Sequence, residues 1–243
     1  MCTVSYIGRE DLKYFTSNRD ENKSRPVAGM PETETRNGKK ITFPKDPVAG
    51  GTWFAVSGNG TVGVLLNGAF QKHIPAYPYQ KSRGLILLEL MDAPEGIRYF
   101  DKTLPEKIEP FTIIFFQNEI LYELRWDGHQ KYRQQLDTDG NYIWSSVTLY
   151  SKDVIHKRNQ LFRNFIADST LITGKSIREF HVNNHNDYEN GFVIRRPNGI
   201  QTQSITQAVI EEDHIRFFYY DMLFNRTEEQ IIQVQKQETI EKG

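Results

Sequence analysis

Residues 1–21, MCTVSYIGREDLKYFTSNRDE, decide the fold prediction for this chain of 243 residues. Two short runs rich in β-branched and aromatic residues, Thr3–Ile7 and Lys13–Ser17, flank a polar turn, a pattern typical of two strands joined in a hairpin. Because a hairpin folds the chain back on itself, the polar block Ser17–Glu21 is expected beside Cys2. The sequence therefore predicts a polar cluster at the amino-terminal edge of a β-sheet.

Cys2 is the single cysteine of the chain and lies next to its first residue. If Met1 is removed, the same residue carries a thiol and a free α-amine, whose ordinary pKa of about 7.7–8.0 suits a general base at neutral pH. A thiol with its own base attached is an activated nucleophile. The alternative is that Cys2 is only a small residue that begins a strand.

Three polar residues further along the chain can support such a nucleophile. Arg19 can hold a thiolate or a substrate carboxylate, because a nearby cation lowers the pKa of a thiol, and Asp20 can orient the α-ammonium. Asn67 ends an apolar strand, where its amide can stabilise an oxyanion. The alternatives are a solvated charged turn around Arg19 and an ordinary Asn-Gly turn at Asn67 and Gly68.

Four sequence blocks occur in a characteristic order within the first 85 residues. They are Met1-Cys2, Asn18-Arg19-Asp20-Glu21, Gly50-Gly51-Thr52-Trp53 followed by a strand that ends in Asn67, and Ser82-Arg83-Gly84-Leu85. With these blocks the sequence resembles the NRDE family, also called transport and Golgi organisation protein 2-like.

The resemblance implies an α+β fold, a four-layer αββα sandwich of the N-terminal nucleophile hydrolase type. That fold is similar to cysteine amidases such as penicillin V acylases and bile salt hydrolases, in which the terminal Cys attacks an amide carbonyl and its own amine shuttles the proton. Carried over to the matching positions, Cys2 is nucleophile and base, Arg19 and Asp20 support it, and Asn67 helps to form the oxyanion hole. Asn18, from the same block, is expected to bind substrate.

The chain departs from the family pattern at two further positions where we expect substrate binding. In Trp144-Ser145-Ser146, Ser146 stands where the family commonly has Asn, which leaves a shorter hydrogen-bond donor. In Thr202-Gln203-Ser204-Ile205-Thr206, Gln203 replaces an expected Arg and removes a charge. The departures imply either a different substrate or reduced amidase activity.

The rest of the chain is expected to combine many strands with few helices. After a long ordered loop, Asn22 to Val48, the expected strands are Thr52–Ser57, Thr61–Leu66, Gly84–Glu89, Phe111–Phe116, Ile120–Trp126, His129–Leu136, Tyr142–Val147, Phe192–Arg195, Ser204–Ile210 and Ile215–Asp221. The expected helical segments are a turn around Ile97–Leu104, a helix from an N-cap at Ser151 to Ala167, and Ser176–Val182. With no break in composition, we expect one α+β domain over residues 1–243 and a frayed tail from about Lys236.

Composition excludes several classes of protein. The 30 Lys and Arg residues against 31 Asp and Glu give a net charge of −1, so there is no overall basic footprint for nucleic acid. No apolar run approaches the roughly 18–20 residues that cross a bilayer, and the amino terminus lacks the pattern of a signal peptide. One cysteine cannot form an internal disulfide, which favours a reducing compartment, the cytoplasm.

Other side chains that attract a functional interpretation are expected to be structural. His181 and His185 have the spacing of two metal ligands on one helix face, yet their stretch is Asn-rich and no metal site is expected. Arg158, with His156 and Lys157, is expected on the solvated face of its helix. The run Phe217–Tyr220 lacks a surrounding basic stripe and is expected to be β core.

The function that these observations favour is hydrolysis of a non-peptide C–N bond in a small-molecule amide, through a thioester on Cys2. No cofactor is expected, and the oligomeric state stays open. The alternative is a non-enzymatic protein that binds or carries a hydrophobic ligand, haem or lipid, as eukaryotic members of the resembled family are linked to haem trafficking and lipid homeostasis.

Overall fold

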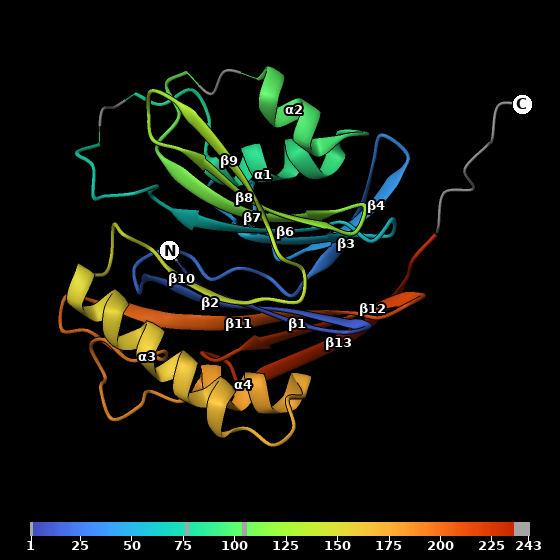
Figure 1. Ribbon diagram of the computed structural model, residues 1–243. Coiled ribbons are helices and arrows are strands. Elements are labelled where there is room, and N and C mark those ends of the chain that lie inside the picture. Colours follow the sequence, from blue (N-terminus) through green and yellow to red (C-terminus); the bar gives the residue numbers. More distant parts are fainter. Residues whose placement is uncertain (1, 76–77, 104–105, 236–243) are drawn as a thin grey trace, which may run out of the picture.

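Two antiparallel sheets lie face to face, and helices cover both outer faces (Figure 1). The structure is a computed structural model that describes residues 2–75, 78–103 and 106–235. The helices are α1 (Arg83–Asp92) and α2 (Gly96–Lys102) on one outer face and α3 (Lys152–Asp168) and α4 (Gly174–Val182) on the other. The expected α+β, four-layer αββα sandwich is confirmed.

The first sheet has six strands and carries the amino terminus. In spatial order they are β10 (Asn141–Ser145), β1 (Cys2–Arg9), β2 (Leu12–Asn22), β11 (Ile200–Ile210), β12 (His214–Asp221) and β13 (Arg226–Gln233). The hairpin predicted from residues 1–21 forms its second and third strands. Strand β13 was not predicted, because Ile231 and Ile232 are the only apolar residues in it.

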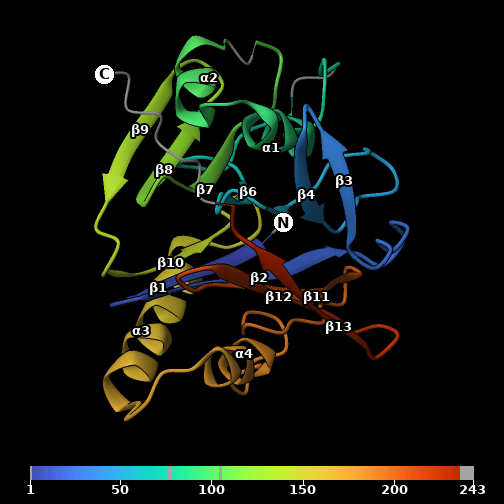
Figure 2. The ribbon, with the colours of Figure 1, turned by 90° about the vertical axis from the view of Figure 1, so that its right-hand side faces the viewer.

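The second sheet has seven strands, which follow one another in chain order. They are β3 (Glu32–Arg36), β4 (Lys39–Phe43), β5 (Phe54–Ser57), β6 (Val62–Asn67), β7 (Phe111–Gln117), β8 (Ile120–Trp126) and β9 (Lys131–Leu136). The loop after β9 leads to β10 in the other sheet, so the chain joins the two layers there (Figure 2).

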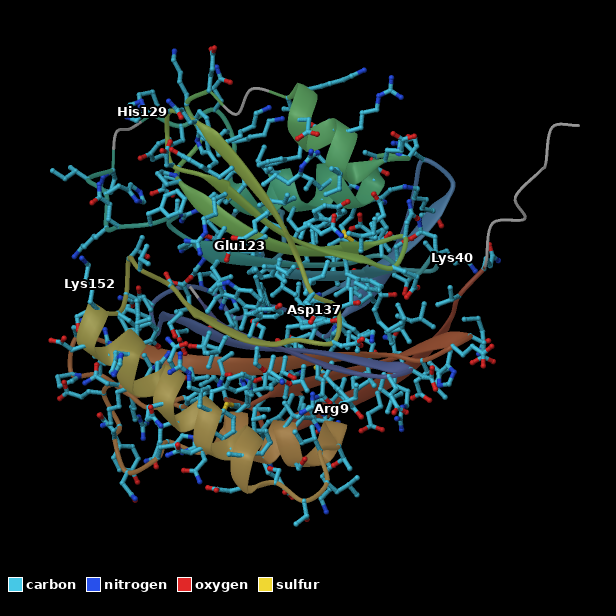
Figure 3. The ribbon with its side chains drawn as sticks, viewed as in Figure 1. Arg9, Lys40, Glu123, His129, Asp137 and Lys152 are labelled. Atoms are coloured by element: carbon cyan, nitrogen blue, oxygen red, sulfur yellow. The ribbon has the colours of Figure 1, made fainter. Side chains whose placement is uncertain are left out.

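The main core fills the space between the two sheets. Strand alternation sends Val4 and Tyr6 of β1 into this space, together with Phe15 of β2 and Phe54 and Phe116 of the second sheet. Trp144 of β10 also donates a hydrogen bond at 2.5 Å to the carboxylate of Glu123 on β8. Figure 3 labels Glu123 in the second sheet. The interior is therefore a sheet-on-sheet core, and each sheet buries its other face under helices.

Three of the expected elements were wrong, two of them in the first half of the chain. The stretch from Asn22 to Val48 is not all loop, because Asn37 and Gly38, with φ of 45° and 80°, form the tight turn of the β3–β4 hairpin. The apolar run from Gly84 to Glu89 is the first part of α1 rather than a strand, and the Ser82 hydroxyl caps this helix by accepting from the Leu85 amide at 3.4 Å. A short apolar run fits a buried strand and a buried helix equally well.

The third wrong element and one partly confirmed element lie elsewhere in the chain. The predicted strand Phe192–Arg195 is absent as a strand, and Arg195 makes only an isolated bridge to Gln201. The helical turn predicted around Ile97 is α2, whereas Leu104 and the predicted tail from Lys236 lie outside the described residues. The described part of the chain contains no helix of the length and apolar character that a bilayer crossing requires.

Helix α1 packs backbone to backbone against the loop that precedes β5. A Cβ atom placed on Gly51 would lie 2.4 Å from the carbonyl carbon of Gly84, closer than real Cβ contacts allow. We therefore expect Gly51→Ala to lower the free energy of unfolding by about 1–3 kcal/mol, the usual cost of overpacking. Urea denaturation measures this loss, and Gly29→Ala is the control, since a Cβ there meets nothing within 4 Å. Equal losses in both variants would contradict the close packing of α1.

Candidate active site

Three of the predicted residues, Cys2, Arg19 and Ser146, lie along one row at the end of the first sheet. Cys2 is the first residue of β1, and the register of the β1–β2 hairpin sets it opposite Arg19. On the other side, Thr3 pairs with Ser145, the last residue of β10, so that Ser146 follows directly at the end of the neighbouring strand. The hairpin thus brings the polar block beside Cys2 as predicted.

Arg19 points toward the second sheet and is only 3% exposed. Its guanidinium carbon lies 4.5 Å from the centre of the Trp53 ring, and it donates hydrogen bonds to the side-chain oxygen of Gln203 and to Asp46 Oδ2, the latter at 2.9 Å. Gln203 reaches this position from a β-bulge, because the register of β11 against β2 shifts between Thr202 and Ser204. Arg19 is therefore held rigidly opposite Cys2.

Asp46 is a site residue that the sequence analysis missed. It accepts two hydrogen bonds from Arg25, each at 2.9 Å, and one each from the amides of Val48 and Ala49. Burial by itself would raise the pKa of Asp46, but these donors and the charge of Arg19 hold it at about 2. Asp46 is thus a permanent counter-charge for two arginines. No motif marks it, since it lies in the loop before Gly50 and Gly51.

Asp20 lies on the opposite face of β2 from Arg19, toward the helices, and is fully buried. The Tyr150 hydroxyl donates to its Oδ2 at 2.6 Å, and the Thr202 hydroxyl donates to its Oδ1 at 2.7 Å. Burial raises the pKa of Asp20, while the charge of Arg158 and these two hydrogen bonds act in the opposite direction. The carboxylate is therefore fixed in place one residue along the strand from Arg19.

Asn67 and Ser146 meet although they come from different sheets. The Ser146 hydroxyl donates a hydrogen bond to the backbone carbonyl of Asn67 at 2.8 Å. Asn67 is half-buried at the end of β6, and within the described residues its side-chain amide has no hydrogen-bond partner. The amide is thus available to a ligand, as an oxyanion donor has to be.

Two clefts flank Asn67. The first, which we call the arginine cleft, has a volume of about 140 Å³ and includes Arg19, Glu21, Arg25, Asp46, Trp53 and Asn67 in its lining. The second, which we call the serine cleft, has a volume of about 180 Å³ and includes Asn67, Arg125, Trp144 and Ser146. Both are smaller than the roughly 300–1,000 Å³ of pockets for drug-sized ligands. The site therefore has room for small groups on either side of Asn67.

Asn18, expected to bind substrate, lies away from these clefts. It is fully buried beneath α4, where its amide nitrogen donates to the carbonyls of His181 and Phe192 at 2.9 and 3.0 Å. Its oxygen accepts from Nδ1 of His181, so that Nε2 of this ring accepts from the Ser5 hydroxyl at 2.7 Å. Ser5, His181 and Asn18 are hydrogen-bonded in series, as the nucleophile, base and orienting residue are in some hydrolases. All three are buried, however, and none lines either cleft.

Three of the four ring nitrogens of His181 and His185 already have polar partners, which leaves little for metal binding. Both ring nitrogens of His181 make the hydrogen bonds above, and Nε2 of His185 lies 3.1 Å from the Phe180 carbonyl. Burial, the charge of Arg158 and the neighbouring His185 lower the pKa of His181 to about 3, so the ring stays neutral. Among the described residues, no three His, Cys, Asp or Glu side chains gather as a metal site.

Comparison with known proteins places this geometry in a family and a fold. Residues 1–220 match the family described as Transport and Golgi organisation 2. No protein in a search of curated proteins matches the chain by sequence.

Solved structures that resemble the chain include those of two hydrolases. A cysteine-to-alanine mutant of the conjugated bile acid hydrolase from Clostridium perfringens has 10% identity and a TM-score of 0.55, with 97% of each chain covered. An arginine-to-leucine variant of the same enzyme has 10% identity and a TM-score of 0.53, covering 94% of this chain and 92% of that one. The N-acylethanolamine-hydrolyzing acid amidase ortholog of Caenorhabditis elegans has 11% identity and a TM-score of 0.54, covering 85% and 92%. At this identity the likeness establishes the fold alone.

Proposed function

The chain belongs to the Transport and Golgi organisation 2 family, and we propose that this member hydrolyses the C–N bond of a small amide with Cys2 as an amino-terminal nucleophile. The observation that carries the proposal is the register of β1 and β2, which sets Cys2 directly opposite Arg19. The proposal requires that Met1 is removed and that the thiol faces the space between the sheets, where Arg19 lies.

In the first half of the reaction, the sulfur of Cys2 attacks the carbonyl carbon of the amide. The α-amine of the same residue takes the thiol proton, and the carbonyl oxygen becomes an oxyanion. The proton then passes to the leaving nitrogen, the C–N bond breaks, and the amine departs. The acyl group remains on the sulfur as a thioester.

In the second half, water attacks the thioester carbonyl. The α-amine accepts a proton from the water and returns it to the sulfur as the C–S bond breaks, which releases a carboxylic acid and restores the thiol. The balance requires only amide and water, so no cofactor is proposed.

The neighbouring side chains have separate roles in this mechanism. Arg19 favours the thiolate by its charge, and Asp20 orients the α-ammonium by its carboxylate. The side-chain amide of Asn67 donates to the oxyanion, and Ser146 fixes Asn67 through the hydrogen bond to its carbonyl. Gln203 stands where the family often has an arginine, and its side-chain oxygen accepts a hydrogen bond from Arg19 and so helps to hold Arg19 in place.

The size of the site supports a small substrate over a large ligand. The clefts on either side of Asn67 measure about 140 and 180 Å³, which suits an acyl group and a leaving amine of a few atoms each. Binding of haem or lipid is the alternative, and it would need a larger opening at this site. We propose that the reaction takes place in the cytoplasm, the compartment that the single cysteine favours.

Asn67→Ala tests the proposed oxyanion site. The variant is expected to lower kcat for hydrolysis of a panel of short N-acyl amides by about 10²-fold or more, because it removes a donor that acts mainly in the transition state. KM is expected to change far less. Steady-state kinetics of the wild type and the variant measure both constants, with Asn59→Ala in the β5–β6 turn as a control outside the site. Unchanged kcat in Asn67→Ala would remove Asn67 from the mechanism.

A further inference from the structure

Arg158 was predicted to be solvated, but it is the largest fully buried side chain of the described residues. His156 and Lys157, beside it on α3, are exposed as predicted. The Arg158 side chain enters the layer between α3 and the first sheet. An arginine is almost never buried completely unless its charge and donors are used, because desolvating the charge costs several kcal/mol.

The guanidinium of Arg158 joins the two strands that end at the candidate site. Nη1 donates to the hydroxyls of Thr3 and Ser145, the latter at 3.4 Å, while Nε and Nη2 donate to the backbone carbonyls of Asn190, at 3.0 Å, and Gly191. Thr3 and Ser145 are register partners. One directly follows Cys2 and the other directly precedes Ser146, so a single side chain ties both strands immediately beside the row that forms the site.

The charge of Arg158 also acts on the buried titratable groups around it. Its guanidinium carbon lies 3.6 Å from the centre of the Tyr150 ring, and the hydroxyl of the same Tyr150 donates to Asp20 at 2.6 Å. Burial raises the pKa of Asp20, and the positive charge of Arg158 opposes this shift. His181, in α4, and His185, shortly after it, face the same charge. Of these three titratable groups, Asp20 is the one whose charged form the positive charge of Arg158 stabilises.

We infer that Arg158 is a positioning residue for the amino-terminal nucleophile, which ties the ends of β1 and β10 beside Cys2 and Ser146 and places a positive charge next to the Tyr150–Asp20 pair. The inference rests on the proposed function. A purely structural role would not need the charge, since well-packed apolar residues often replace buried ionic groups without loss of stability. The two contributions, strand tethering and charge, can be separated by substitution.

Two variants of the full chain separate strand tethering from charge, and a third serves as the control. Arg158→Met keeps most of the side-chain length and removes the charge and the donors, whereas Arg158→Lys keeps the charge but cannot bridge the two strands and the 190–191 turn together. Arg163→Met, at an exposed position of the same helix, is the matched control. For each folded variant we would measure acylation of Cys2 by p-nitrophenyl acetate and the titration of Asp20 by ¹³C NMR of labelled Asp carboxyls, with Asp20→Asn to identify the signal.

Arg158→Met is expected to slow acylation at least about tenfold and to raise the midpoint of the Asp20 titration by about one pH unit or more. Arg158→Lys is expected to slow acylation similarly, while the Asp20 titration stays near that of the wild type. If Arg158→Met fails to fold, the acylation rate of Arg158→Lys alone tests the tethering role. Arg163→Met is expected to match the wild type in both. Wild-type acylation rates in folded Arg158→Met and Arg158→Lys would overturn the role of Arg158, whereas a wild type that is not acylated at all would overturn the proposed function itself.

Discussion

Cys2→Ala is expected to reduce hydrolysis of p-nitrophenyl acetate by at least about 10³-fold. The variant removes the sulfur that forms the acyl-enzyme but keeps the backbone of β1 and, after removal of Met1, the α-amine that serves as base. The loss of rate therefore measures the contribution of the sulfur separately from that of the α-amine. Release of p-nitrophenolate, followed by absorbance in a stopped-flow experiment, measures both the acylation burst and the steady state.

Cys2→Ser provides the graded control for this prediction. Its hydroxyl is a weaker nucleophile with a higher pKa, so we expect a residual rate well below that of the wild type but above that of Cys2→Ala. Circular dichroism and thermal unfolding of the two variants check that the fold is retained. Wild-type turnover in Cys2→Ala would show that another group carries out the reaction.

The free energy of unfolding is expected to fall steeply between pH 6.5 and pH 3 because of His181. The pKa of this buried ring is about 3 in the folded protein, well below its ordinary value of 6.5, so the unfolded chain takes up a proton that the folded chain excludes. The stabilisation is fully present above pH 6.5 and is lost as the pH falls through about 3. At about 1.4 kcal/mol per pH unit, the contribution of His181 reaches about 5 kcal/mol.

Urea denaturation at a series of pH values tests this. His181→Gln keeps hydrogen-bonding capacity without a titrating ring, and we expect its free energy of unfolding to depend less on pH, by about 2 kcal/mol between pH 6.5 and pH 4.5. His156→Gln, at an exposed position of α3, is expected to keep the wild-type dependence. The same slope in His181→Gln and the wild type would show that another group causes the acid sensitivity.

The part of the fold that could be predicted is the part whose signal is local. The β1–β2 hairpin, the β5–β6 and β7–β8 hairpins and the N-cap of α3 at Ser151 follow from alternation, turn residues and capping, and all are confirmed. Helix α1 was predicted as a strand because its apolar residues are nearly continuous, and only packing against β5 and β6 distinguishes the two. The Asn37-Gly38 pair is a typical hairpin turn and could have predicted β3 and β4, but the many charged residues around it favoured a loop instead.

The sequence predicted which residues lie close together where they follow one another along a hairpin, but not where their proximity depends on distant contacts. The register that joins Cys2 and Arg19 follows from the first 21 residues. The ion pair between Arg19 and Asp46 joins residues 27 positions apart through a loop that carries no motif. The burial of Arg158 depends on acceptors in β1, in β10 and around residue 190, which no pattern within α3 can reveal.

Intact mass spectrometry of the native protein, before and after exposure to a β-lactone that acylates thiols, tests the central claim most directly. The account predicts that Met1 is absent and that the protein gains a single adduct, which peptide mapping places on Cys2. A retained Met1 together with an unmodified Cys2 would contradict an amino-terminal nucleophile and would favour ligand binding as the role of this fold, with haem and lipid as the first ligands to examine.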